Sequence, residues 1–190
     1  MKTCKPWGNL KKAKILVIGH DPNLLYLNIF PEYCFFMEYL SDEYKNNNKY
    51  KNRYKLAKST INYLRGLIDY KVNEDEIYFT NLCNNELSES TVKDLDYMEY
   101  YISRENAEDG LRNIKEILKN SNIKLILATS LQVNYWLQEL KFYKYNNTFL
   151  KEASPQSWFV SQNCYVPTSR FDSSKSQFYN LCGECFKTET

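Results

Sequence analysis

Short runs of apolar residues, each bounded by polar residues or by glycine and proline, recur four times along the chain. Runs of this length that are rich in β-branched and aliphatic residues predict buried strands. Between the runs, apolar residues recur at three- to four-residue spacing, which predicts amphipathic helices. The polar stretch 41–53 is expected to form an exposed loop or a frayed helix end whose charges lie in solvent. The strands are expected at 14–19, 76–82, 123–130 and 157–166, and the helices at 54–70, 105–119, 131–140 and 173–186.

Strand and helix alternate throughout this predicted order. The alternation predicts a central, mostly parallel sheet of four strands, with helices on both faces and right-handed crossovers. The expected fold is therefore α/β, a three-layer α/β/α sandwich. A chain of 190 residues is long enough for one sizeable core and short for two, so a single domain spanning 1–190 is expected.

The first predicted strand ends in the sequence Gly19-His20-Asp21-Pro22-Asn23. Ligands of open α/β sheets bind at the carboxyl edge of the strands, so we expect the polar residues of this turn to line a crevice. The alternative interpretation is an ordinary turn in which Asp21 caps the next helix. Because His20 is the only histidine, it is expected to line the pocket or to form a hydrogen bond rather than to hold a metal.

Polar residues also end the other predicted strands. Parallel strands share one carboxyl edge, so side chains that are distant in sequence can meet there around a single ligand. An alternative for Asn81 is a turn residue whose side chain satisfies backbone groups. These strand ends are Thr80-Asn81, Thr129-Ser130 and Thr168-Ser169-Arg170.

An aromatic cluster, Tyr33-Cys34-Phe35-Phe36-Met37-Glu38-Tyr39-Leu40, follows the first strand end. Aromatic rings bury large areas and offer π faces, so this cluster can supply a flat wall for stacking a planar ligand. The alternative is that the rings cover the core.

Together these segments resemble the uracil-DNA glycosylase superfamily. The first strand of that family ends in a motif of the form Gly-Gln-Asp-Pro-Tyr, for which this chain has Gly19-His20-Asp21-Pro22-Asn23. A later strand of the family ends in asparagine, often as Thr-Asn, and here Thr80-Asn81 matches. Between the two motifs the family places a phenylalanine that stacks on the base, and Phe35 or Phe36 lies at a suitable place.

The resemblance implies a uracil-DNA glycosylase-like fold and an enzyme that hydrolyses the N-glycosidic bond of uracil or a related base in DNA. It implies that Asp21 activates a water or stabilises the sugar cation that develops as the bond breaks. It implies that Asn81, whose amide offers both a donor and an acceptor, reads the edge of the extruded base. Phe35 or Phe36 would stack on that base. His20 is expected among the catalytic residues with Asp21, and Thr80 and Asn23 among the residues that bind the substrate.

Two departures from the family motifs motivate an alternative function. Where the family's last motif is His-Pro-Ser, this chain has Pro167-Thr168-Ser169-Arg170-Phe171, in which Ser169 and Arg170 are expected to contact substrate. Asn23 stands where the family often has a tyrosine or glycine that shapes the pocket. The alternative is a catalytically weak or inactive member of the same fold that binds a nucleotide, a nucleic acid or a protein. An unrelated nucleotide-binding domain is disfavoured, because no glycine-rich phosphate loop occurs among five glycines.

The net charge of the chain neither indicates nor excludes a nucleic-acid partner. With 25 basic and 23 acidic residues the net charge is +2, so any surface that binds DNA must be a local basic patch. No apolar stretch is long enough to span a bilayer, and the first residues do not resemble a signal peptide. We therefore expect a cytoplasmic protein without a membrane partner, and we expect it to be a monomer.

Six cysteines in such a chain favour reduced thiols, a metal site or redox chemistry over a framework of disulfides. Only Cys182-Gly183-Glu184-Cys185 has the spacing of metal ligands. One pair with two isolated cysteines would form a zinc or iron-sulfur site only if the fold gathered them. Free, mostly buried thiols and no cofactor are the expectation.

Overall fold

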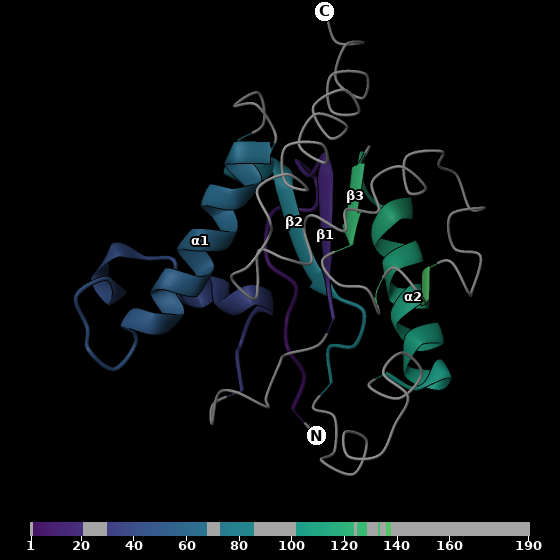
Figure 1. Cartoon of the computed structure of the whole chain (residues 1–190). Coiled ribbons are helices and arrows are strands. Elements are labelled where there is room, and N and C mark those ends of the chain that lie inside the picture. Colours follow the sequence, from purple (N-terminus) through teal and green to yellow (C-terminus); the bar gives the residue numbers. More distant parts are fainter. Residues whose placement is uncertain are drawn as a thin grey trace, which may run out of the picture.

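The computed structural model describes residues 2–20, 30–67, 73–85, 102–123 and 125–128, together with positions 133, 136 and 137. Within these ranges the protein is a layered α/β structure with a parallel sheet between two helices (Figure 1). The mixed α/β class and the parallel sheet are as expected from the sequence. The predicted fourth strand at 157–166 and the closing helix at 173–186 lie outside the described residues.

Three parallel strands form the sheet in the order β2-β1-β3. They are β1 (Ile15–Gly19), β2 (Ile77–Asn81) and β3 (Leu125–Ala128), each within its predicted run. All five residues of the central strand β1 are buried. Burial on both faces explains why its sequence is continuously apolar rather than alternating. In register, Ile15 lies opposite Ile77, and Gly19 lies opposite Asn81.

One face of the sheet packs against helix α1 (Lys51–Leu67) and the 3-10 segment η2 (Cys34–Tyr39). The helix begins three residues before its predicted start at 54, because the turns that precede it already donate backbone hydrogen bonds in helical fashion. Lys51, for example, donates its N–H to the carbonyl of Asn47 at 2.8 Å. The buried core of this face comprises Ile15, Val17, Cys34, Met37, Ala57, Ile61, Leu64, Ile77, Phe79 and Leu127, with Cys4 beside them.

The other face packs against helix α2 (Arg104–Lys119). Its first turn is capped by Ser103, whose hydroxyl oxygen accepts the N–H of Asn106 at 3.3 Å. At Gly110 the helix approaches so closely that a Cβ there would collide with the carbonyl of Leu82, so α2 supports the chain just beyond β2. The core of this face comprises Leu16, Ile18, Leu82, Cys83, Ile102, Ala107, Leu111, Ile114, Ile126, Val133, Trp136 and Leu137.

The N-terminal segment lies along the outer edge of β2. Trp7 and Phe79 exchange backbone hydrogen bonds of 3.0 and 2.8 Å, and their rings meet edge to face with centroids 5.7 Å apart. Nearby, Thr3 forms an antiparallel bridge with Asn85. The segment therefore covers backbone groups of an edge strand that would otherwise be open to pairing.

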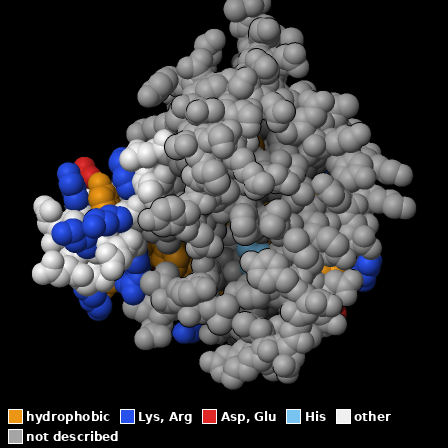
Figure 2. Space-filling model, viewed as in Figure 1, with side chains coloured by type: hydrophobic (Ala, Val, Ile, Leu, Met, Phe, Trp, Pro, Cys, Tyr) orange, Lys and Arg blue, Asp and Glu red, His pale blue; other side chains and the backbone are white. Residues whose placement is uncertain are grey.

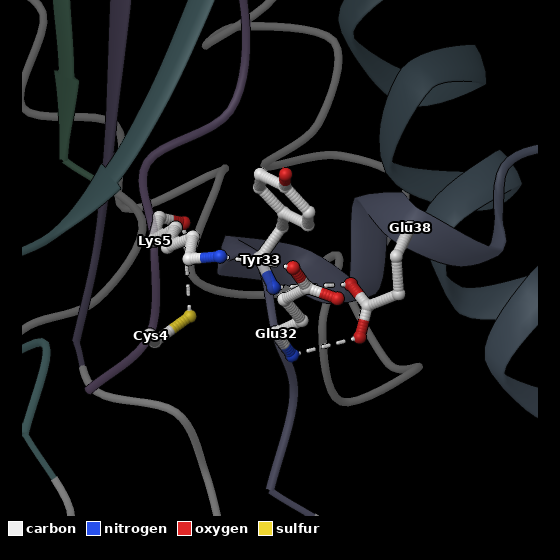
Figure 3. A network of polar contacts seen from close by, with 5 residues as sticks. All are labelled: Cys4, Lys5, Glu32, Tyr33 and Glu38. Carbon is white, nitrogen blue, oxygen red and sulfur yellow. Dashed lines mark hydrogen bonds and ion pairs between the residues drawn. The ribbon is translucent and has the colours of Figure 1, made fainter. Parts of the chain in front are cut away.

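A polar network fixes η2 against this N-terminal segment (Figure 3). The ammonium group of Lys5 pairs with the carboxylate of Glu32 at 3.0 Å. The Glu38 carboxylate accepts the backbone N–H groups of Glu32 and Tyr33 at 3.0 and 3.2 Å. In addition, Cys34 donates its N–H to the carbonyl of Lys5 at 2.9 Å. The aromatic segment thus begins from a position held by several hydrogen bonds.

Within the described ranges, no helix has the length and the apolar character needed to cross a bilayer.

Candidate functional site

Gly19 and Asn81 end two neighbouring strands and lie directly opposite each other in the sheet. Alternation along the strands places the Asn81 side chain on the same face as Phe79, and Gly19 on the same face as Val17. That face is the one covered by η2 and α1. Asn81 is only 3% exposed, so its amide is buried at the carboxyl edge of the sheet.

Gly19 is in contact with both a polar group and an aromatic ring. A Cβ atom at this position would overlap the side-chain oxygen of Asn81 and would lie 2.9 and 3.0 Å from two ring carbons of Phe35. Only a residue without a side chain allows the amide and the ring to come together here. Gly19, Asn81 and Phe35 therefore meet at one edge of the sheet.

The aromatic partner is Phe35 rather than Phe36. The Phe35 ring packs against Phe79 with centroids 5.2 Å apart and the ring planes at 60°. Phe36 is buried and packs against Tyr39, at 6.4 Å between centroids. Both phenylalanines have left-handed backbone angles, with φ of 60° and 58°. Such angles cost a residue with a side chain about 1–3 kcal/mol, so the surrounding contacts must hold this bend.

The Asn81 amide nitrogen is buried, and within the described part of the chain no acceptor lies within hydrogen-bonding distance of it. A buried donor without a partner costs about 1–3 kcal/mol, and such groups are retained mainly where they serve a function. The backbone N–H of Asn81 is satisfied separately, by the side-chain oxygen of Asn84 at 3.2 Å. The fold therefore fixes the residue and leaves one amide donor available.

Asn84 positions the end of β2 through four contacts. Its side-chain oxygen accepts the N–H of Asn81 and the thiol of Cys34, the latter at 3.4 Å. Its amide nitrogen donates to the Thr80 hydroxyl at 3.4 Å, and its carbonyl accepts the N–H of Cys4 at 2.7 Å. Asn84 is not among the site residues predicted from the sequence. Its amide, which can donate and accept at once, is the signal that fits this bridging role.

The loop after β2 also holds the residues that follow β1. Leu82 donates its N–H to the carbonyl of Gly19 at 2.8 Å, and Cys83 donates to the carbonyl of His20 at 3.0 Å. The predicted site residue His20 is partly buried next to this contact. Thr80 is 1% exposed, and its hydroxyl donates to the carbonyl of Asn81 at 3.4 Å, so it serves the strand end itself. Of the other predicted site residues, Asp21, Asn23, Ser169 and Arg170 lie outside the described part.

Buried thiols lie beside the site. The Cys4 thiol contacts the Cys34 sulfur at 3.6 Å, and Cys34 in turn donates to Asn84. Burial, and after it the neighbouring Cys4 thiol, raises the pKa of the Cys34 thiol well above its ordinary value. Cys4, Cys34 and Cys83 are free cysteines, as expected for reduced thiols. These three therefore pack as small apolar side chains rather than as nucleophiles.

The described residues contain no group of three or more histidine, cysteine, aspartate or glutamate side chains that could hold a metal ion. The predicted ligand pair Cys182 and Cys185 lies outside them. Among the described groups, the site offers an amide and an aromatic ring. Such a set suits a planar polar ligand.

The fold and this site define an α/β protein with a buried amide and an aromatic ring at the carboxyl edge of a parallel sheet. No model of a known protein family matches the sequence, and a search of curated proteins gives no match either. The functional argument therefore depends on the geometry of the site and on the motifs in the sequence.

Proposed function

We propose that the chain is a hydrolase of the DNA glycosylase type, which cleaves the N-glycosidic bond of uracil or a related base in DNA. The single observation that carries the proposal is the amide donor of Asn81, which has no partner among the described residues, beside the Phe35 ring at Gly19. The resemblance to the uracil-DNA glycosylase superfamily assigns base reading to Asn81 and base stacking to Phe35 or Phe36, which supports the proposal.

Recognition of the base follows from the chemistry of these two side chains. The edge of a pyrimidine presents a donor next to an acceptor, which one amide can satisfy in a bidentate manner. Because the Asn81 donor lacks a partner in the described part, an extruded base would regain a hydrogen bond that folding left unmade. Phe35 supplies an apolar surface on which a flat ring can lie.

The chemical step is assigned to Asp21, two positions after Gly19 in the sequence. A water oxygen forms a bond to C1′ of the sugar, the bond from C1′ to the base nitrogen breaks, and its electron pair leaves with the base. The Asp21 carboxylate accepts the water proton, or stabilises the positive charge that grows on the sugar. His20 lines the same turn as a hydrogen-bonding group, and Ser169 and Arg170 are proposed to contact the substrate.

Single-stranded and double-stranded oligonucleotides that contain one uracil test this proposal directly. Abasic product, revealed by alkaline strand cleavage, is expected from the wild type and should be absent from Asp21→Ala. The matched control is Asp75→Ala, which removes an exposed carboxylate paired with Lys12 and should leave the rate unchanged. No abasic product from the wild type, or equal rates in Asp21→Ala and the wild type, would refute the hydrolase.

A binding module that has lost catalysis is the second candidate. It is favoured by one observation, the replacement of the family's His-Pro-Ser motif by Pro167-Thr168-Ser169. Tight binding of a uracil-containing strand without release of base, together with weaker binding by Asn81→Leu, would identify this second function.

A further inference from the structure

Three tyrosine rings cluster where η2 passes into the turns before α1. Tyr39 stacks on Tyr50 with centroids 5.3 Å apart and planes at 26°. Tyr44 meets both rings edge on, at 5.2 and 5.6 Å. All three side chains are only partly buried. The rings therefore present aromatic surface at the outside of the molecule, and one of them, Tyr39, belongs to the segment η2 that carries Phe35.

Arg53 lies over two of these rings, and among the described residues no acid pairs with it. Its guanidinium carbon is 5.4 Å from the centre of the Tyr39 ring and 5.5 Å from that of Tyr50. Its Nε and Nη1 atoms are buried, and no acceptor among the described residues receives their protons. A shielded cation with unfilled donors in a fixed fork is a receptor for an anion such as phosphate.

Lysines surround this arginine, and in the described ranges no carboxylate pairs with them. The segment 41–60 has six basic residues and two acidic ones. Of the two acids, Asp42 accepts the hydroxyl of Tyr54 at 3.2 Å. Some lysines elsewhere pair with acids, for example Lys5 with Glu32 and Lys12 with Asp75. The exposed lysines of this segment are Lys45, Lys49, Lys51 and Lys55.

Figure 2 shows these basic side chains gathered on a projection at the left, over η3 (Asp42–Tyr44) and the start of α1. We name this surface the basic lobe and define it by Tyr39, Tyr44, Lys45, Lys49, Tyr50, Lys51, Arg53 and Lys55. From the sequence, the charges of residues 41–53 were expected to lie in solvent without a further role. The structure adds that they lie near an aromatic cluster and a partly buried guanidinium.

We infer that the basic lobe binds the sugar-phosphate backbone and bases of single-stranded DNA. Lysines along a backbone, together with aromatic and guanidinium surfaces for the bases, are the combination by which proteins hold single strands without reading sequence. Since Phe35 and Tyr39 belong to one short segment, a strand whose base enters the site continues over the lobe. The inference rests on the proposed function for its choice of DNA as the substrate.

Fluorescence anisotropy with a labelled oligothymidine that contains no uracil tests the lobe separately from catalysis. The triple variant Lys45→Gln, Lys49→Gln and Lys51→Gln should lose about tenfold in affinity at moderate salt. When log affinity is plotted against log salt concentration, the slope for this variant should be smaller in magnitude by about 2, the value for three lost phosphate contacts on a single strand. Arg53→Lys keeps the charge but loses the planar fork, and should also weaken binding.

The matched control is the triple variant Lys5→Gln, Lys12→Gln and Lys119→Gln, which removes the same charge from lysines that pair with acids. It should bind like the wild type. Equal losses in the two triple variants, or unchanged binding by both, would overturn the inference. Tighter binding of a duplex than of the single strand, or equal binding of heparin with the same lysine dependence, would also overturn it.

The outcomes for the lobe and for the enzyme can be told apart. If the protein binds oligothymidine through these lysines but releases no uracil, the proposed hydrolase activity is refuted and DNA binding by the basic lobe stands. If both triple variants release uracil and bind the substrate as tightly as the wild type, the hydrolase activity stands and DNA binding by the lobe is refuted. Thermal unfolding of each variant shows whether a loss of binding reflects the surface or the fold.

Discussion

The side-chain oxygen of Asn81 occupies the space into which any side chain at Gly19 would have to extend. The two residues face each other across the ends of β1 and β2, and the Phe35 ring closes the same space from η2. The absence of a side chain at position 19 is therefore a condition for bringing a polar amide next to an aromatic ring.

Gly19→Ala is expected to displace Asn81 and Phe35 together. The added methyl group overlaps the amide oxygen and lies within 3.0 Å of the ring, and overpacking of this kind costs about 1–3 kcal/mol. Denaturant unfolding should show that loss in the free energy of unfolding, and binding of a uracil-containing strand should weaken. Adding Asn81→Ser to Gly19→Ala should recover stability without recovering binding. Wild-type stability and binding in Gly19→Ala would contradict this geometry.

Asn81→Leu should separate stability from function. The substitution keeps the size of the side chain and removes a buried amide donor that has no partner in the described part of the chain. The free energy of unfolding should therefore stay constant or rise by about 1 kcal/mol, while binding of the base is lost. Chemical denaturation and anisotropy measure the two effects. A fall in stability of about 2 kcal/mol or more would mean that the amide is a structural group.

Asn84→Ala should destabilise the end of β2. The change removes the acceptor for the Asn81 N–H and for the Cys34 thiol, and leaves buried groups unsatisfied. A loss of about 2 kcal/mol in the free energy of unfolding is expected. The neighbouring Asn85→Ala is the control, because its side chain accepts only an exposed hydroxyl from Thr3 among the contacts found here. It should change stability by less than about 0.5 kcal/mol. Equal effects of the two substitutions would argue against the bridging role of Asn84.

Glu38 should make a small contribution to stability that declines as the pH rises. Burial raises the pKa of this carboxyl above its ordinary value of 4.5, against the opposing effect of its backbone hydrogen bonds. A raised pKa in the folded state means that the contribution is fully present below the ordinary pKa and is lost as the pH rises through the folded value. The free energy of unfolding of the wild type, minus that of Glu38→Gln, should therefore fall as the pH rises through that range, because glutamine does not titrate. A difference that rises with pH would refute the assignment.

The strands could be predicted from the sequence because a parallel strand buried on both faces leaves a continuous apolar run. A second rule, that parallel strands share one carboxyl edge, predicted that the strand ends at Gly19 and Asn81 lie at the same edge of the sheet. The choice between Phe35 and Phe36 could not be made, because it depends on a left-handed backbone at both residues that only their surroundings stabilise.

Contacts between residues far apart in the chain could not be predicted from the sequence. The N-terminal segment pairs with the edge of β2 through backbone groups of Trp7, and no periodic pattern marks such a bridge. Lys12 and Lys14, which lie near the first strand, pair with Asp75 and Glu76 rather than remaining open to phosphates. Arg53, for which the described residues supply no acid, belongs to a stretch that was expected to be solvated loop or frayed helix.

The bend at Phe35 and Phe36 has a consequence for how the site responds to a ligand. Burial of an aromatic side chain such as Phe36 contributes about 1.5–3 kcal/mol. Two left-handed residues oppose it at a cost of about 1–3 kcal/mol each, so burial of Phe36 alone does not hold the bend. The hydrogen bonds that Glu38 and Lys5 make at the start of η2 supply the rest. A ligand that stacks on the Phe35 ring would therefore rest on a surface whose shape is set by contacts some distance from the ligand itself.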